Sequence, residues 1–267
     1  MTVRDALDRG FSFVEERGNA LDCARAAVLS AGGQIDGVVE LIAPPQRENG
    51  ELCCPETREA GTGIDAALYV LGILDDLRAL GVPLLEMTCT HLEAVQSRDG
   101  NWFGRVGDSI DDRLFTTGML AGYLAKTRWA RPQMLMAAGD YLCRHWSPDR
   151  VKGWNWRGIA AHAHYFANVP HDAADEVLQW CGRELERGFR AQQWGALQTA
   201  RVLVCCDAHG IPGARVGARE LKGEILSEQR GDGGWSDLTA PTPTARVERT
   251  LEAMTALAHF SGGRGRP

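Results

Sequence analysis

Two short segments of the chain are nearly identical, and they constrain its architecture more than any other feature. One runs Gln96-Ser-Arg-Asp-Gly100-Asn-Trp102 and the other Gln229-Arg-Gly-Asp-Gly233-Gly-Trp235. A third segment, Gln46-Arg-Glu-Asn-Gly50-Glu-Leu52, keeps the glutamine and the glycine but ends in leucine. The glutamines are separated by 50 and 133 residues, and the longer interval is about three periods of 44. A period of this length is typical of repeat proteins.

The rest of the chain completes six units, each with a first helix, a turn rich in Gly, Asp or Trp, and a second helix. Apolar residues recur at helical spacing, and little of the chain alternates as a half-buried strand would. The first helices are predicted near Val3–Glu16, Gln34–Ala43, Leu84–Gln96, Gln133–His145, Ala173–Phe189 and Arg215–Gln229. The second helices are predicted near Ala20–Ser30, Arg58–Leu80, Asp111–Lys126, Ile159–Asn168, Trp194–Ala208 and Thr244–Phe260.

Helix pairs cannot bury their own apolar faces, so the six units must stack on one another. An open solenoid usually ends in atypical, polar capping repeats, whereas the last unit here holds one of the two complete motifs. This favours a closed ring. We therefore predict an all-α protein, an (α/α)6 barrel or toroid, with residues 1–267 as a single domain and residues 261–267 as a flexible tail.

The charge and the hydropathy of the chain argue against two kinds of partner, nucleic acids and the membrane interior. The net charge of −6 argues against a nucleic-acid backbone as the main partner, and no apolar run approaches the roughly 20 residues of a membrane span. The charged N-terminus lacks the apolar core of a signal peptide, so a cytoplasmic location is expected. In that compartment the eight cysteines are expected to be reduced thiols.

The repeated segments resemble the QW motifs of the class II terpenoid cyclases, such as the squalene–hopene cyclases, and more loosely the repeats of protein prenyltransferase β subunits. The fourth and fifth units carry degenerate copies, Gly153-Trp154-Asn-Trp156 and Gln193-Trp194-Gly195. In the QW motif the glutamine joins helix ends by hydrogen bonds and the tryptophan packs over a neighbouring helix. The resemblance covers the whole chain as six repeats and implies the fold, whereas chemistry has to be argued from a site.

Chemistry is suggested by Asp108-Ser-Ile-Asp-Asp-Arg113, which leads into the second helix of the third unit. Class II cyclases place a DxDD motif at the start of an inner helix, and its third-position aspartate protonates an alkene or epoxide. The resemblance makes Asp111 the proton donor and Asp112 the last aspartate, with Ser109 in place of the first. An alternative alignment uses Asp108 with one extra residue.

A proton donor of this kind needs clustered carboxyls, because like charges a few ångströms apart raise one pKa and so retain a proton. The competing interpretation is structural. Ser or Asp before a helix caps its free N–H groups, and acidic residues in a first turn suit the helix dipole. Both interpretations of Asp111 and Asp112 remain open at this point.

Aromatic residues near the starts of the inner helices are candidate substrate contacts, because aromatic faces stabilise cations. Packing is the alternative role for each of them. They are Trp154, Trp156, Trp194 and Phe115, and Tyr165 further along the fourth inner helix is a candidate beside His162 and His164.

His162 and His164 lie two apart on one helix and face different directions, so at most one is expected to reach the cavity, where it would contact the acid or accept the final proton. A core histidine is the alternative. Arg157 and Arg201, with Arg113, Arg246 and Arg249, would form a phosphate clamp if they turn inward, and are solubilising charges if they do not.

The leading hypothesis is therefore a small cyclase, isomerase or lyase of the terpenoid-cyclase type that acts on a hydrophobic isoprenoid. The runner-up is a transferase-like barrel that binds a prenyl diphosphate, and the third is a non-catalytic toroidal subunit. No cofactor or metal is expected. Mg²⁺ would be needed only for a diphosphate substrate, and zinc is less favoured because the Asp-x-Cys part of the prenyltransferase ligand set is missing. A partner subunit or a homo-oligomer would complete the site if the single barrel does not suffice.

Overall fold

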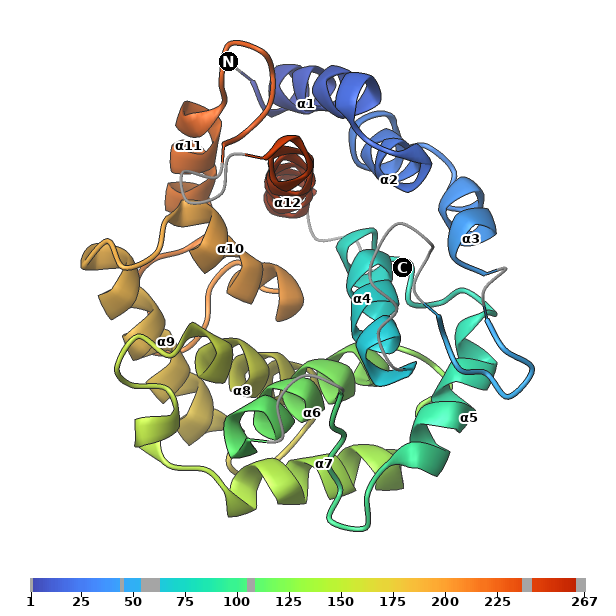
Figure 1. Cartoon of the computed structure of the whole chain (residues 1–267). Coiled ribbons are helices and arrows are strands. Elements are labelled where there is room, and N and C mark those ends of the chain that lie inside the picture. The colour runs from blue at the N-terminus through green and yellow to red at the C-terminus, as the bar shows by residue number, and fades with distance from the viewer. Residues whose placement is uncertain (1, 44–45, 54–62, 105–108, 237–241, 263–267) are drawn as a thin grey trace.

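The computed structural model describes residues 2–43, 46–53, 63–104, 109–236 and 242–262, and these ranges contain helices and no strand. Figure 1 shows the first helices of the six pairs on the outside of a ring, with most of the second helices inside it. The first helices are α1 (Val3–Arg17), α3 (Asp36–Ile42), α5 (Leu85–Val95), α7 (Pro132–Arg144), α9 (Ala174–Arg190) and α11 (Ala218–Glu228). The second helices are α2 (Ala20–Ala31), α4 (Gly63–Asp76), α6 (Ile110–Ala125), α8 (Trp156–Asn168), α10 (Ala196–Cys205) and α12 (Pro243–Ser261).

The last pair of helices returns to the first, because α12 packs against both α1 and α2. The prediction of an α/α toroid is therefore confirmed. The helix bounds agree with the predicted ones to within three residues in every pair except the second. There α4 begins at Gly63 and ends at Asp76, while residues 54–62 lie outside the described part of the chain. At the C-terminus α12 continues to Ser261, where a flexible tail was expected to begin.

The repeated glutamines connect successive units through hydrogen bonds. Gln96 Nε2 donates to the carbonyl of Gly100 in its own turn, at 2.8 Å, and to that of Met134 in α7, at 3.0 Å. Gln229 Nε2 makes the corresponding bonds to Gly233 and to Ala6 of α1, at 2.7 and 2.9 Å. The same side chain that links one unit to the next along the chain thus also joins the last unit to the first, which closes the ring.

The two tryptophans of the complete motifs occupy equivalent buried positions. The indole N–H of Trp102 donates to the carbonyl of Leu92 at 2.8 Å, and that of Trp235 donates to Ile225 at 2.7 Å. Each side chain is 1% exposed. Gly100 has a φ of +92°, and a Cβ there would collide with the Ala137 carbonyl, so the turn requires glycine.

The C-terminal ends of several inner helices meet around buried charges, which we call the ionic end. Lys126, which follows α6, donates from Nζ to both carboxylate oxygens of Asp75 in α4, at 2.8 and 2.9 Å, and to the Cys205 carbonyl of α10 at 2.7 Å. Arg201 of α10 reaches across to Asp76 of α4 at 2.9 and 3.0 Å. These bonds tie α4, α6 and α10 together.

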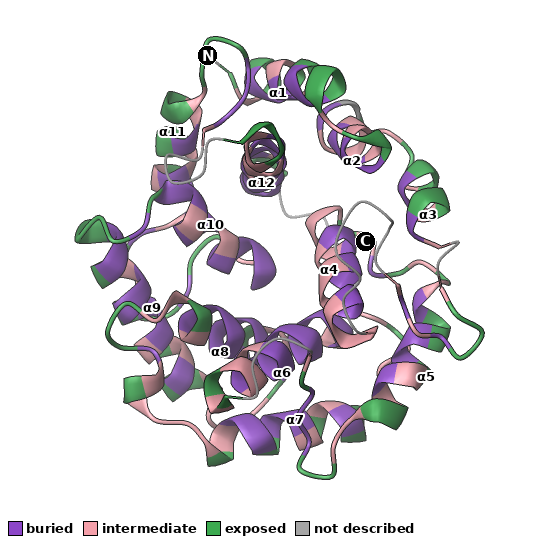
Figure 2. Ribbon diagram, in the orientation of Figure 1, coloured by how far each residue is buried: buried purple, intermediate pink, exposed green. Residues whose placement is uncertain are grey.

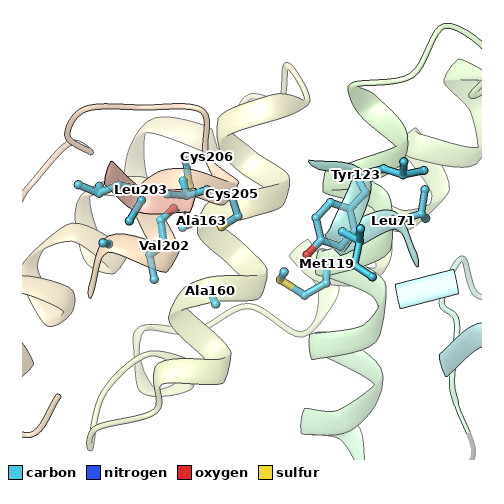
Figure 3. Packing of buried hydrophobic residues seen from close by; sticks show 14 of the residues in the cluster. Leu71, Met119, Tyr123, Ala160, Ala163, Val202, Leu203, Cys205 and Cys206 are labelled. Atoms are coloured by element: carbon cyan, nitrogen blue, oxygen red, sulfur yellow. Dashed lines mark hydrogen bonds between the residues drawn. The ribbon is translucent and has the colours of Figure 1, made fainter. Parts of the chain in front are cut away.

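Apolar side chains of α4, α6, α8 and α10 pack beside these charges. Figure 3 shows Leu71, Met119 and Tyr123 on one side, and Ala163, Val202 and Cys205 on the other. The buried colouring of Figure 2 follows the faces of the inner helices, while exposed residues gather on the outer helices and turns. Burial raises the pKa of Asp75 to about 6, even though Lys126 beside it acts in the opposite direction.

Candidate functional site

The opposite end of the inner helices holds a pocket of about 180 Å³, which we call the pocket end. It lies between the first turns of α6 and α8, and the short 3₁₀ helix η1 (Pro148–Arg150) contributes one wall. Four predicted site residues from two neighbouring inner helices meet there. The pocket is lined by Asp111, Leu114, Phe115, Arg150, Asn155, Arg157, Gly158 and His162.

Two capping residues set the local geometry of the pocket. Ser109 is the N-cap of α6, and its hydroxyl accepts the N–H of Asp112 at 3.1 Å. Asn155 is the N-cap of α8, where its side-chain oxygen accepts the N–H of Gly158 at 3.0 Å. The amide nitrogen of Asn155 also donates to the Arg150 carbonyl at 2.7 Å, so η1 is fixed to the start of α8. The capping function expected of this sequence is thus performed by Ser109.

The two candidate aspartates are each paired with a separate arginine. Arg150 Nη1 lies 2.7 Å from Asp111 Oδ1, and Arg157 Nη1 lies 2.9 Å from Asp112 Oδ1. The Ser109 hydroxyl also donates to Asp112 at 2.6 Å. The hydrogen bond from Ser109, with a smaller contribution from Arg157, lowers the pKa of Asp112. For Asp112 this is the opposite of the shift expected from clustered carboxyls. The Asp111 side chain is 63% exposed.

His162 lies on the pocket wall and is itself fully buried. Its Nδ1 is 2.8 Å from the Gly158 carbonyl, and because a carbonyl only accepts, Nδ1 carries the proton. Burial lowers the pKa of the imidazole to about 4, so the ring is neutral at pH 7 and Nε2 is a hydrogen-bond acceptor. Nε2 has no hydrogen-bond partner in the described part of the chain.

Arg157 and Phe115 form the rim of the pocket. The guanidinium carbon of Arg157 lies 4.4 Å from the centre of the Phe115 ring, which is a cation–π contact. Arg157 therefore holds Asp112 and Phe115 at once. The structure brings together five of the predicted residues, namely Asp111, Asp112, Phe115, Arg157 and His162.

His164 and Tyr165 lie away from the pocket. His164 packs against Gly122 and Tyr123 of α6, with its ring 4.5 Å from that of Tyr123, and burial lowers its pKa well below the usual value. The Tyr165 hydroxyl donates to the Leu135 carbonyl of α7 at 3.0 Å, so this side chain joins α8 to the outer ring. Both predicted site residues take the packing role that was the alternative.

The three candidate tryptophans separate into different environments. Trp194 is 5% exposed and packs on Gly188 of α9, with its indole N–H 3.3 Å from the Leu185 carbonyl, so it packs much as Trp102 does. Trp156 donates its indole N–H to the Gln198 carbonyl of α10 at 3.0 Å.

Trp154 is 44% exposed and has a φ of +65°, a left-handed conformation that is unfavourable for a bulky side chain. Arg201 is occupied at the ionic end by Asp76. Neither residue lines the pocket.

Sequence reasoning missed Arg150, Asn155 and Trp146. Asn155 directly precedes the residues of α8, and this N-cap signal would have placed both the start of the helix and the pocket wall. Arg150 had no comparable signal, because its role depends on how η1 folds back on α8. Trp146 lies behind His162, with ring centres 5.0 Å apart.

A larger open groove of about 780 Å³ lies over the first turns of α11 and contains none of the predicted residues. Its lining includes His209, Arg215, Arg219 and Glu220. Across the described residues, no group of three or more His, Cys, Asp or Glu side chains is arranged to hold a metal ion. The seven cysteines in the described ranges are free thiols. Within those ranges, no helix combines the length and apolarity needed to cross a membrane.

Comparison with protein-family models and with curated proteins finds no match. Among solved structures, the chain is similar to a variant of the type II terpene cyclase MstE from Scytonema, solved in complex with its substrate, geranylgeranyl dihydroxybenzoate. The match has a TM-score of 0.62 over 97% of each chain, at 13% sequence identity. At this identity the similarity establishes the fold, and the chain therefore has the fold of a type II terpene cyclase.

Proposed function

We propose that the protein is an enzyme of the terpenoid-cyclase type, which cyclises or rearranges an isoprenoid or other polyene bound inside the ring. The observation that carries the proposal is the pocket end, where Asp111, Phe115, Arg157 and His162 come together on neighbouring inner helices of a terpene-cyclase fold. A pocket of about 180 Å³ is smaller than the roughly 300–1,000 Å³ of typical ligand sites, so it would hold only one end of such a substrate.

In this proposal Asp111 donates the proton that starts the reaction. An ion pair with arginine is made by the charged carboxylate, so Asp111 has to separate from Arg150 and carry a proton before it can donate one. Its exposure of 63% leaves room for the separation. Asp112 keeps its charge and holds Arg157 over Phe115. His162, neutral and with a free lone pair on Nε2, is the group that takes the final proton.

No metal or cofactor enters this proposal. A prenyl diphosphate is the less favoured substrate, because Arg150 and Arg157 already neutralise Asp111 and Asp112, which leaves no net positive charge among these four side chains.

The test is turnover of a panel of polyenes and isoprenoid alcohols, with products identified by gas chromatography and mass spectrometry. Asp111→Asn should abolish product formation while leaving the fold intact, because the amide keeps the shape and has no acidic proton. Asp112→Asn is the matched control on the same helix turn and should cause a smaller loss. Full activity of Asp111→Asn on a substrate that the native protein converts would refute the proton-donor role and favour a binding function.

A further inference from the structure

Most of the pocket wall has a fixed shape. Gly158 admits no side chain, because a Cβ there would lie 2.1 Å from the carbonyl oxygen of Arg150. The Asn155 amide donates to the same carbonyl at 2.7 Å, which holds this part of the wall against α8. His162 is fully buried and Leu114 is 3% exposed, so neither side chain has room to move.

The rim is built differently, from two side chains of different helices. Phe115 of α6 is half-buried and lies one turn after Asp111, so both face the pocket from the same side of the helix. The side chain of Arg157, from α8, is 55% exposed. Its guanidinium carbon lies 4.4 Å from the centre of the Phe115 ring. The ring and the guanidinium therefore form one wall that is held by a cation–π contact.

Asp112 holds this rim in place although it does not line the pocket. Its Oδ1 is 2.9 Å from Arg157 Nη1, and its Oδ2 accepts from the Ser109 hydroxyl at 2.6 Å. The hydrogen bond from Ser109 lowers the pKa of Asp112, so the carboxylate is charged at neutral pH. Arg157 is thus held on one side by Asp112 and rests on Phe115 on the other.

The volume of the pocket, about 180 Å³, matches a single six-membered ring. An engineered apolar cavity of about 150 Å³ in another protein holds one benzene molecule. A second, fused ring would have to overlap Phe115 or push Arg157 aside, and forcing extra atoms into a filled space is unfavourable. Phe115 is also the largest apolar side chain of the lining, so its removal adds the most space.

We propose that Phe115 and Arg157 set the size limit of the pocket, which accepts the open end of a prenyl chain or one six-membered ring and excludes a fused bicycle. Asp112 is the positioning residue that maintains this limit by holding Arg157 over Phe115. The inference deepens the proposed function, and it rests on that function only in taking the pocket as the place where one end of the substrate binds.

The test compares two neutral alcohols that differ by one fused ring, benzyl alcohol and 2-naphthylmethanol. Methyl NMR of Leu114, which lines the pocket, follows binding in the intact protein, and Leu120 of the same helix is the reporter outside the pocket. Benzyl alcohol should shift the Leu114 methyl signals and leave those of Leu120 unchanged. In the native protein 2-naphthylmethanol should bind at least about tenfold more weakly.

Two variants should weaken this preference. Phe115→Ala should abolish or reverse it, because the second ring can occupy the space of the lost phenyl group. Asp112→Ala should narrow it, because Arg157 is released, and it provides the test if Phe115→Ala does not fold. We expect α6 to form in Asp112→Ala, since α12 has Ala245 at the equivalent position after its N-cap.

Phe103→Ala is the matched control and should keep the native preference. Phe103 also lies under an arginine, with the guanidinium carbon of Arg113 5.3 Å from its ring centre, but it does not line the pocket. Equal binding of both alcohols to the native protein would overturn the size limit. An unchanged preference in Phe115→Ala would overturn the role of Phe115, and so would the same change in Phe103→Ala.

The absence of any Leu114 shift with benzyl alcohol, in the native protein and in Phe115→Ala, would also overturn the proposal. These measurements need no turnover, so they separate the size limit from the proposed function. If the preference changes as expected and no polyene is converted, the size limit stands and the cyclase function fails. Conversion of a polyene by a protein without this preference would have the reverse meaning.

Discussion

The two ends of the inner helices use the same kind of ion pair in different surroundings. At the ionic end, the side chains of Asp75 and Lys126 are 9% and 10% exposed, and Lys126 has three hydrogen-bond acceptors. At the pocket end, Asp111 and Arg150 are 63% and 30% exposed. A buried pair cannot be separated without leaving a charge in an apolar interior, whereas an exposed pair exchanges its partner for water at little cost. The comparison indicates that one end is a structural closure and the other end can open to a ligand.

The largest expected effect comes from removing one buried charge. Lys126→Met should lower the free energy of unfolding by about 3–5 kcal/mol, because it leaves the Asp75 carboxylate without its partner in the interior. Denaturant unfolding followed by circular dichroism measures the change.

The matched control is Lys152→Met, which removes a lysine from the exposed pair with Asp149 and should cost less than about 1 kcal/mol. The double variant Asp75→Leu with Lys126→Met should recover much of the lost stability, since no lone charge remains. A loss below about 1 kcal/mol in Lys126→Met alone would show that the ionic end is not the closure described above.

Trp102 and Trp235 test the contrast between ionic and apolar closure. Each belongs to a turn that leads into an inner helix, and each is 1% exposed. Trp102→Ala and Trp235→Ala should each lower the free energy of unfolding by about 3–5 kcal/mol, the usual cost of removing a large aromatic side chain from a core.

That loss should not change with salt or with pH between 5 and 8, because no charge is involved. Melting curves close to those of the native protein for both variants would contradict the structural role of the repeated segments.

Acid titration should act with opposite sign at His162 and at Asp75. Folded His162 has a pKa of about 4 against 6.5 for an ordinary histidine, so the unfolded state binds more protons in this window and stability falls as the pH falls. Folded Asp75 has a pKa of about 6 against 3.8, so it takes up its proton first in the folded state and stability rises as the pH falls. Each shift corresponds to about 3 kcal/mol.

Denaturant unfolding at several values between pH 4 and 7 separates the two contributions. The native protein should lose stability on acidification, because burial also lowers the pKa values of His164 and His259. His162→Phe should make this loss smaller and Asp75→Asn should make it larger. A change of the same sign in both variants would contradict the opposite contributions of His162 and Asp75.

The smallest effect is expected at Trp154, which is exposed at the start of α8 and strained at a φ of +65°. Trp154→Asn should change the free energy of unfolding by less than about 1 kcal/mol, because asparagine adopts the left-handed conformation readily. This gain offsets the loss of the edge-to-face contact between Trp154 and Trp194, whose ring centres are 6.2 Å apart. Thermal melting measures it. A large loss would mean that Trp154 is a packing residue like Trp194. The pocket end would then be as tightly packed as the ionic end, contrary to the contrast drawn above.

The ring itself could be predicted because helical spacing and the repeated Gln-x-x-x-Gly-x-Trp segments are local signals. The same hydrogen bonds recur at Gln96 and Gln229. The bond from Gln96 links one unit to the next, and the bond from Gln229 links the last unit to the first. The predicted start of the second inner helix, Arg58, lies outside the described residues, and its predicted end, Leu80, lies four residues beyond the end of α4 at Asp76.

The candidate site was predicted only in part, because its contacts are made between distant segments. Asp111 was selected from the resemblance to the DxDD motif, and Phe115, Arg157 and His162 from helix position and residue type. The sequence could not show that Arg150 would pair with Asp111, or that Tyr165 would face α7. The ionic end also escaped prediction, since Asp75 and Lys126 are 51 residues apart and meet only when the ring closes.

The most direct test of the account is a crystal structure of the protein with farnesol bound. The account predicts the isoprenoid chain inside the ring with one of its ends in the pocket beside Asp111 and Phe115, and with the Asp75–Lys126 pair unchanged. Farnesol bound at the ionic end, or in the open groove over α11, would contradict the claim that the substrate binds at the starts of α6 and α8.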